Sequence, residues 1–233
     1  QHFTPSTNSY ADRQHFISIG NFRHEPNWDA VLFLKQHIWP LIRKQLPKAE
    51  LHIYGAYPPP KATQLHNAKQ GFLVKGWAED AKQVMQQARV CLAPLRFGAG
   101  IKGKLAEAMF CGTPNVTTNI GIEGMTMGLD WPGLTTDLNT FDSFEDSAQN
   151  IANHAVQLYQ EQSFWQQKQQ QGYQLLKTNF AKDEIQAQLL ARITDIQNKL
   201  STYRADNFIG QMLQHHQLKS TQYMAQWIEA KNR

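Results

Sequence analysis

Residues 89–118 read RVCLAPLRFGAGIKGKLAEAMFCGTPNVTT, and this stretch decides the fold class. Its first part, residues 90–95, is a short apolar run of the kind found in strands that are buried on both faces of a parallel sheet. A glycine-rich turn follows, and the turn leads into a helix-forming segment at residues 104–111. A strand, a glycine-rich turn and a helix in this order are typical of a phosphate-binding site.

The glycine-rich turn suits an anion for a physical reason. The first amides of a helix have no partner within the helix, and the aligned peptide dipoles leave partial positive charge at that end. Gly98, Gly100 and Gly103 allow close approach to the bare backbone. Lys102 and Lys104 add two full positive charges. We therefore expect this turn to hold a diphosphate.

Glu107 extends the expected site toward a sugar. It lies three residues after Lys104, about one helical turn further on. A carboxylate there can accept hydrogen bonds from two neighbouring ribose hydroxyls, so that the pattern indicates a nucleotide. A second interpretation stays open, because glycines also serve plain tight turns. The spacing of Gly98, Gly100 and Gly103 matches the residue pattern of the dinucleotide fingerprint but not its position. The fingerprint belongs to the first strand–helix unit of a domain, whereas several such units precede it here.

The segment PLRFGAGIKGKLAEAMFCGTPNVTT, with GWAEDAKQVMQQARVCLAP before it and IGIEGM after it, also carries a family resemblance. It resembles the carboxyl-terminal half of GT-B nucleotide-sugar glycosyltransferases of the "glycosyl transferases group 1" kind. The resemblance extends from about residue 16 to about residue 180, and EAM-x-CGTP is its most specific part. It implies an α/β fold: one Rossmann-like parallel sheet with helices on both faces, half of a GT-B fold, plus a carboxyl-terminal helical extension.

The resemblance covers one domain of two, and it implies a division of this chain. We expect a linker or domain edge at residues 1–14, and a Rossmann-like domain that binds the donor nucleotide at residues 15–182. Residues 183–233 are expected to form helices and a tail that pack on this domain or on a partner. The missing partner is expected to be an amino-terminal acceptor domain.

By resemblance, Glu107 corresponds to a ribose ligand, and Gly100, Ile101 and Lys102 belong to a loop whose backbone amides bind the diphosphate. Lys104 and Glu107 are the residues expected to act in catalysis. All the positions expected to bind the donor are Gly20, Arg23, Gly76, Trp77, Gly98, Gly100, Ile101, Lys102, Lys104, Glu107, Gly121 and Glu123.

Three expected roles have open alternatives. Arg23 is either a phosphate contact or an exposed loop charge. Trp77, next to Gly76 in a turn that lies along the nucleotide base in the family, either stacks on the base or packs in the core. Glu123 either faces the donor sugar or caps a turn in the loop NIGIEGM.

The family pattern is not fully kept. Many members carry a second glutamate eight positions before the EAM glutamate, where it contacts the donor sugar, and that position is Ala99 here. A related subset has a GAGIKxK-like sequence, as this chain does. Many members also have an arginine directly after Gly20, whereas Asn21 follows here and Arg23 is displaced. The identity of the donor sugar therefore stays open.

Apolar patterning predicts the remaining elements. Asn27 is expected to cap a helix that begins after it, with a kink at Pro40, and Asp80 is expected to cap a further helix. From residue 142 onward the chain is expected to be helical. The other expected strands are residues 16–20, 51–54, 72–75, 115–118 and 134–136.

Composition sets limits on partners and compartment. The 233 residues carry a formal net charge of +4, which favours anionic partners, but no dense basic run or nucleic-acid motif is present, so nucleic acid is not expected. Cys91 and Cys111 form no disulfide framework, and no secretory signal is recognised. We expect a cytoplasmic protein, with peripheral association at the inner face of the membrane left open. His215 and His216 are adjacent and do not share a helix face, so no metal is expected.

The resulting functional expectation is a glycosyltransferase of polysaccharide biosynthesis. It would transfer a sugar from a nucleotide-diphosphate sugar, its donor substrate, to a carbohydrate or lipid-linked acceptor, with no further cofactor. The resemblance implies a retaining reaction without a protein nucleophile, and the isolated chain is expected to turn over poorly. Two alternatives stay open: a nucleotide-sugar epimerase or hydrolase of GT-B architecture, and a non-catalytic nucleotide-binding module.

Overall fold

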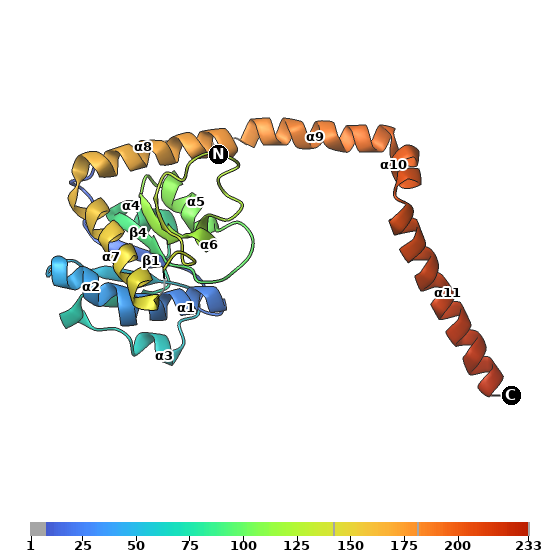
Figure 1. Cartoon of the computed structure of the whole chain (residues 1–233), viewed down its shortest axis with the longest axis horizontal. Coiled ribbons are helices and arrows are strands. Elements are labelled where there is room, and N and C mark those ends of the chain that lie inside the picture. Colours follow the sequence, from blue (N-terminus) through green and yellow to red (C-terminus); the bar gives the residue numbers. More distant parts are fainter. Residues whose placement is uncertain (1–7, 142, 181, 233) are drawn as a thin grey trace. The chain divides into compact units, whose positions relative to one another are not determined.

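The computed structural model describes residues 8–141, 143–180 and 182–232, without the side chains of 182–184 and 214–218. The chain divides into two compact units, Gln1–Phe180 and Ala181–Arg233, and each is described by itself (Figure 1). Six parallel strands form the sheet of the first unit. They are β1 (His15–Ile19), β2 (Leu51–Tyr54), β3 (Phe72–Gly76), β4 (Ala88–Ala93), β5 (Asn115–Thr118) and β6 (Leu134–Thr136).

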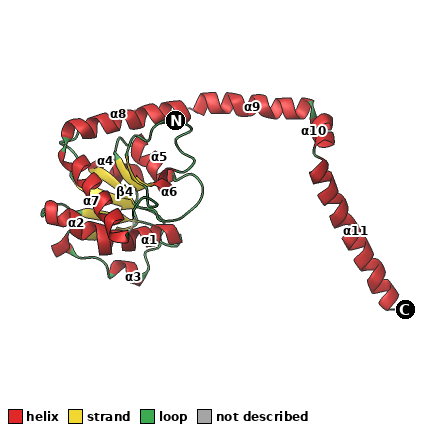
Figure 2. Cartoon of the chain, viewed as in Figure 1, coloured by secondary structure: helices red, strands yellow, loops and turns green. Residues whose placement is uncertain are grey.

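Helices cover both faces of this sheet, as expected (Figure 2). The helices of the first unit are α1 (Glu25–Phe33), the π-helical η1 (Leu34–Ile38), α2 (Trp39–Gln45), α3 (Pro60–Thr63), the 3₁₀-helical η2 (Ala68–Gln70), α4 (Ala81–Gln87), α5 (Gly103–Phe110), α6 (Asn119–Ile122), α7 (Phe144–Gln160) and α8 (Gln162–Asn179). The second unit consists of α9 (Lys182–Asn198), α10 (Leu200–Asp206) and α11 (Phe208–Lys231).

The strand order is β3-β2-β1-β4-β5-β6. From β1 the chain builds outward through β2 to β3, then returns to place β4 on the other side of β1 and builds outward to β6. The connection therefore reverses direction between β1 and β4. In open parallel sheets, ligands bind outside the carboxyl ends of the strands at such a switch point. The glycine-rich turn follows β4 directly, so it lies at this edge.

Alternating residues of the strands fill two cores. Phe16 of β1 packs with Val31 and other residues of α1, η1, α2 and α7 on one face. Ile17, its neighbour in sequence, packs with Met85 of α4 and Ala108 of α5 on the other. This is the period-two pattern of a strand that is buried on both sides. The carboxyl edge between the two cores is thus held rigidly.

Two local expectations were wrong. Helix α1 begins at Glu25 with His24 as its N-cap, so Asn27 lies inside the first turn and caps nothing. Pro26 explains the earlier start, because a proline suits the first turn of a helix, where its missing N–H is not needed. The loop expected at NIGIEGM contains the short helix α6, which Thr118 caps by accepting a hydrogen bond from the Gly121 N–H at 3.2 Å.

Other local expectations were confirmed. Strands β2 and β5 begin and end at the predicted residues. Asp80 caps α4 through hydrogen bonds from the amides of Lys82 and Gln83. The kink expected at Pro40 stays a prediction; the π-helical turn η1 directly precedes the helix that contains this proline.

Arg13, within the expected linker, is completely buried in the first unit. Its guanidinium donates to the carbonyl oxygen of Ala88 at 3.1 Å, to Oγ1 of Thr113 at 2.7 Å and to the carbonyl oxygen of Cys111 at 2.7 Å. Cys111 and Cys91 are free, buried thiols, and burial raises the pKa of Cys91 to about 12. Of the two alternatives for residues 1–14, a linker or a domain edge, the burial of residue 13 favours the domain edge.

The second unit exposes many large apolar side chains, including Leu189 on α9 and Phe208, Ile209 and Trp227 on α11. The expectation that this tail packs on the domain or on a partner stays a prediction. The expectation for His215 and His216 lies outside the described side chains. Within the described residues, no helix combines the length and apolar character needed to cross a membrane.

Stability is expected to fall between pH 7 and pH 5 because of His15. Its ring stacks on that of His52 with centroids 3.8 Å apart. Burial, with lesser effects from His52 and Lys75 and against the opposing effect of Glu50, lowers the pKa of His15 to about 4. The neutral form therefore stabilises the fold, and this stability is lost as pH falls from the ordinary value of 6.5 toward 4. Linkage gives roughly 1–2 kcal/mol between pH 7 and pH 5.

Urea unfolding at pH 7, 6 and 5 measures this dependence. The variant His15→Phe should reduce it, whereas His24→Gln, at an exposed histidine, should not. An unchanged pH dependence in His15→Phe would show that His15 does not carry the effect.

Candidate functional site

The carboxyl end of β1 meets the start of α5 at the switch point. The Lys104 Nζ donates to Oδ1 of Asn27 at 2.5 Å, and the Nδ2 of Asn27 donates to the carbonyl oxygen of Asn21 at 3.0 Å. A Cβ at Gly20 would lie 2.7 Å from the Asn27 Cγ and 2.9 Å from the Lys104 Nζ. Only glycine at position 20 leaves both side chains where they are. The Lys104 side chain therefore lies against Gly20 and is held there by its hydrogen bond to Asn27.

The Lys104 ammonium is a half-buried cation. Burial lowers its pKa to about 8, so that the charged form still predominates at neutral pH. No carboxylate of the described residues forms an ion pair with it. A cation held in this way is ready to interact with an anion that enters from solution.

The glycine-rich turn presents bare backbone. Gly98 and Gly100 have φ angles of 129° and 77°, which favour glycine. A Cβ at Gly100 or Gly103 would meet no described atom within 4 Å beyond its chain neighbours, so space is open beside both residues. Lys102 occupies the N-cap position of α5 and makes no side-chain cap hydrogen bond. The turn thus leaves its backbone open to a ligand, and its expected role as an anion-binding loop stays a prediction.

Helix α1 fixes the position of this turn. Asp29 binds Arg96 through both carboxylate oxygens, one of them accepting from Nε at 2.8 Å. The same guanidinium lies over the rings of Phe33 and Phe144, with 5.1 Å and 4.7 Å to their centroids. Sequence reasoning missed Arg96 and Asp29. The arginine two residues before Gly98 was the available signal, but its partner lies 67 residues away in the chain.

Lys102 lies on the other side of the turn. Its side chain is buried, with Nζ 3.5 Å from the carbonyl oxygen of Gly98 and 3.9 Å from a carboxylate oxygen of the exposed Glu123. Ile101 is exposed. Gly121 has a packing reason to be glycine, since a Cβ there would overlap the Oγ1 of Thr117. The structure therefore pairs Lys102 with Glu123.

Glu107 lies on α5, one turn after Lys104, with its side chain partly exposed. This is the expected order of lysine and carboxylate on the helix. Arg23 is exposed and lies over the ring of Tyr57 at 3.9 Å from its centroid. It contacts this neighbouring loop rather than either lysine. Tyr57, which the sequence reading did not single out, has a φ of 56° and is itself exposed.

Gly76 ends β3 with a φ of 77°, and Trp77 follows it with 69% of its surface exposed. Trp77 therefore does not pack in the core, which was one of its two alternatives. An indole that stands free in solvent next to a strand end is available to stack on a planar ligand. Whether a base occupies this position stays a prediction.

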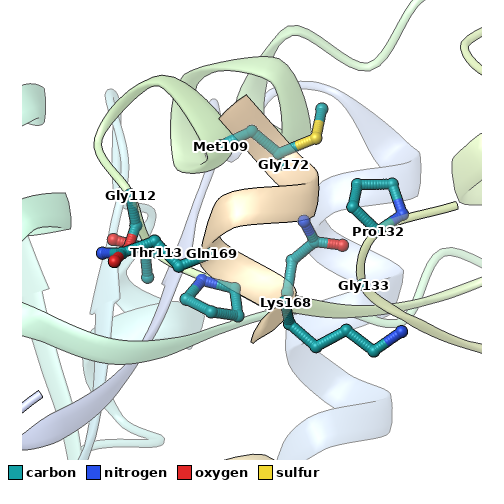
Figure 3. A pocket seen from close by; sticks show the side chains of 10 residues that line it. Met109, Gly112, Thr113, Pro132, Gly133, Lys168, Gln169 and Gly172 are labelled. Carbon is teal, nitrogen blue, oxygen red and sulfur yellow. The ribbon is translucent and has the colours of Figure 1, made fainter. Parts of the chain in front are cut away.

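A pocket at the amino ends of the strands, opposite the glycine-rich turn, does not belong to this site. It is lined by Gly112, Thr113, Pro114 and Asn115, which lead into the amino end of β5, together with residues of α8 (Figure 3). Gln169 donates from Nε2 to the carbonyl oxygen of Gly112 at 2.8 Å and ties the two walls together. This pocket lies away from the carboxyl edge where the glycine-rich turn is found.

Comparison with known families gives one match. The profile of the family "Glycosyl transferases group 1" matches residues 13–160. A search of curated proteins gave no match.

Solved structures show the same fold. The pneumococcal O-GlcNAc transferase GtfA, crystallised with UDP and GlcNAc, is 18% identical over 83% of this chain and 38% of its own, with a TM-score of 0.63. A point mutant of S. aureus TarM, crystallised with fondaparinux, alpha-GlcNAc-glycerol and UDP, is 16% identical over 82% of this chain and 38% of its own, with a TM-score of 0.60. The carboxyl-terminal domain of the group 1 protein LpcC from Francisella tularensis is 16% identical over 76% of this chain and 95% of its own, with a TM-score of 0.56.

The coverage separates these structures into two kinds. This chain spans less than two fifths of the length of GtfA and of TarM, but the match takes in nearly all of the isolated LpcC domain. The likeness is therefore to a single domain, the carboxyl-terminal one in LpcC. At these identities it concerns the fold.

Proposed function

The chain belongs to the group 1 glycosyl transferases, and on that premise we propose that it is the half of such an enzyme that binds the donor, a nucleotide-diphosphate sugar. The observation that carries the proposal is the Lys104 ammonium, held by Asn27 at the switch point beside the open glycine-rich turn. A half-buried cation and the first amides of a helix, together at the carboxyl ends of the strands, form a receptor for phosphate groups.

The same groups explain how a sugar can be transferred. When the bond between the sugar and the diphosphate breaks, negative charge grows on the departing phosphate. Lys104, Lys102 and the first amides of α5 stabilise this charge, and each positioned donor of this kind contributes roughly 3 kcal/mol in the transition state. We propose a retaining reaction in which the departing diphosphate guides the acceptor, without a protein nucleophile.

The ligands crystallised with similar proteins support the choice of substrates to test first. GtfA and TarM were crystallised with UDP, so uridine is the first base to test. Another similar structure, WaaG, is described as a glycosyltransferase of lipopolysaccharide biosynthesis and has a TM-score of 0.52. We propose a carbohydrate or lipid-linked acceptor, held by an amino-terminal acceptor domain, in a cytoplasmic enzyme that can associate with the inner face of a membrane.

Titration calorimetry of the chain with UDP, GDP and ADP tests the donor site. Binding of one nucleoside diphosphate supports it, whereas a folded chain that binds none contradicts it. Addition of the acceptor domain then tests transfer. Ala99, in place of the family glutamate, makes a non-catalytic binding module the alternative: nucleotide binding without sugar transfer in the completed protein would favour it.

Glu107→Gln is expected to abolish recognition of the ribose. The wild-type chain should bind UDP about tenfold more tightly than 2′-deoxy-UDP, because the missing 2′-hydroxyl removes one hydrogen bond to the charged carboxylate, worth about 1.4 kcal/mol. The variant should bind both ligands about equally, since its single amide oxygen can accept from the 3′-hydroxyl, which both ligands carry. Calorimetry with the two nucleotides measures the ratio. Pyrophosphate is the control ligand and should bind both proteins alike; a variant that still prefers UDP tenfold would assign the ribose to another residue.

A further inference from the structure

The first turn of α1 touches the proposed donor site at three points. Asn27 accepts from Lys104, Asp29 binds Arg96, and Pro26 lies against Gly98, where a Cβ would come within 3.3 Å of the proline ring. None of the sequence segments that carry the family resemblance includes this turn. The contact with Lys104 is the one that reaches a side chain proposed to bind the donor.

We infer that Asn27 is a positioning residue of the donor site: its side-chain amide holds the Lys104 ammonium at the switch point so that the ammonium keeps its charge for the phosphate groups of the donor. This inference rests on the proposed function. It goes beyond it by assigning a role to a residue outside the glycine-rich turn and by predicting how nucleotide binding is coupled to protons.

The orientation of the Asn27 amide is fixed by its two partners. A backbone carbonyl can only accept a hydrogen bond, so the oxygen of Asn21 must face the amide nitrogen. An ammonium can only donate, so Lys104 must face the amide oxygen. The two bonds are satisfied together in one orientation and lost together in the flipped one. Asn21 therefore orients Asn27, and Asn27 orients Lys104.

The location of the ammonium follows from Gly20. Because a Cβ at Gly20 would lie 2.9 Å from the Lys104 Nζ, the ammonium sits against the backbone at the carboxyl end of β1. Lys104 itself belongs to the first turn of α5. The ammonium thus bridges the two sides of the switch point, between the β1–α1 loop and the turn that follows β4. An anion at the amino end of α5 meets it there.

The chemical type of the partner matters as much as its place. An amide oxygen orients an ammonium without neutralising it, whereas a carboxylate would cancel its charge. Lys102 differs from Lys104, since its Nζ lies 3.9 Å from the exposed Glu123 carboxylate, which offsets part of its charge and leaves the rest for an anion. Lys104, whose pKa burial lowers to about 8, gains an opposite charge only when an anion binds. Binding of a diphosphate should then raise this pKa and draw a proton from solution near pH 8.

Calorimetry with UDP at pH 8, in two buffers that differ in ionisation enthalpy, measures the protons taken up on binding. The wild-type chain should take up a fraction of a proton, up to about one half, because near its pKa half of the Lys104 side chains are neutral before UDP binds. Asn27→Ala should weaken binding about tenfold, the value of one hydrogen bond to a charged group. Asn153→Ala, at an exposed asparagine of α7, is the matched control and should bind as the wild type does.

Asn27→Asp separates positioning from a structural role. The new carboxylate should pair with Lys104, keep it protonated before UDP binds and abolish the proton uptake, with affinity at least about tenfold lower. A merely structural role of Asn27 would change thermal stability and leave the proton count as in the wild type. Normal UDP affinity in Asn27→Ala, or equal proton uptake in Asn27→Asp and wild type, would overturn the inference while the donor site stands. Failure of the folded wild type to bind any nucleoside diphosphate would overturn both.

Discussion

Replacement of Lys104 by methionine is expected to weaken UDP binding by about 100-fold, which corresponds to the loss of about 2.7 kcal/mol of charge-assisted hydrogen bonding. The reason is the position of the ammonium at the switch point, held on Asn27 and free of any described ion pair. Methionine has a similar length and no charge, so it removes the interaction with phosphate without opening a cavity. Titration calorimetry at pH 7 measures the change.

The same replacement is expected to make the folded chain more stable. Folding lowers the pKa of Lys104 from its ordinary value of 10.5 to about 8 because the ammonium is buried. The charged form is therefore disfavoured in the folded state, and this cost is present at every pH below about 8. An apolar side chain avoids it, and we expect a gain of about 1–3 kcal/mol at pH 7, seen as a rise in the thermal unfolding midpoint of several degrees.

Opposite changes in binding and stability distinguish a binding cation from a structural one. Lys177→Met, at an exposed position of α8, is the control and should change neither quantity. A Lys104→Met chain that is less stable and binds UDP normally would show that Lys104 serves the fold. A gain in stability with a loss of binding is the behaviour of a site that gives up stability for function.

Short-range patterns in the sequence predicted the frame of this site. Strands β2 and β5 could be predicted to the residue because each is an apolar or β-branched run bounded by glycine, proline or a polar turn. The glycine-rich turn was predicted because its glycines and lysines lie within seven residues of one another in the sequence, at residues 98–104. Its expected phosphate contacts remain predictions that the nucleotide titrations test.

Long-range pairs could not be predicted in this way. Asn27 was interpreted as a helix cap, which is the common local role of asparagine next to a helix, while its real partner lies 77 residues away. The bond between Asp29 and Arg96 is hidden for the same reason. Which loops meet at the carboxyl edge depends on the strand order, and the strand order is not written in any single segment.

Arg13 was missed because it stands in a polar stretch that resembles a linker, and arginine is seldom fully buried. In the structure it joins the two ends of the segment that carries the glycine-rich turn. Ala88 begins β4, Cys111 directly follows α5, and both carbonyl oxygens accept from the Arg13 guanidinium. The ring of Trp165 lies against the same guanidinium, 5.3 Å from centroid to Cζ. Arg13 thus holds the strand–turn–helix segment closed at its base.

Arg13→Ala is expected to lower the free energy of unfolding by about 3–5 kcal/mol, since it leaves buried acceptors without donors and opens a cavity. A loss of this size corresponds to a fall in the thermal midpoint of roughly 10 °C for a unit of this length. Arg13→Lys keeps the positive charge but not the planar set of guanidinium donors. Its free energy of unfolding should therefore lie between those of the wild type and of Arg13→Ala. Thermal unfolding followed by circular dichroism measures all three proteins.

Arg23→Ala is the matched control, because Arg23 is exposed and its loss should change the midpoint little. A chain with Arg13→Ala that unfolds at the wild-type temperature would mean that water replaces the lost donors at no cost. With the expected result, nucleotide binding by Arg13→Ala, measured well below its midpoint, should stay near the wild-type value. Arg13 contacts the two ends of the strand–turn–helix segment, whereas Lys104 lies next to its glycine-rich turn. Arg13 should therefore control the stability of the chain, and Lys104 the binding of nucleotide.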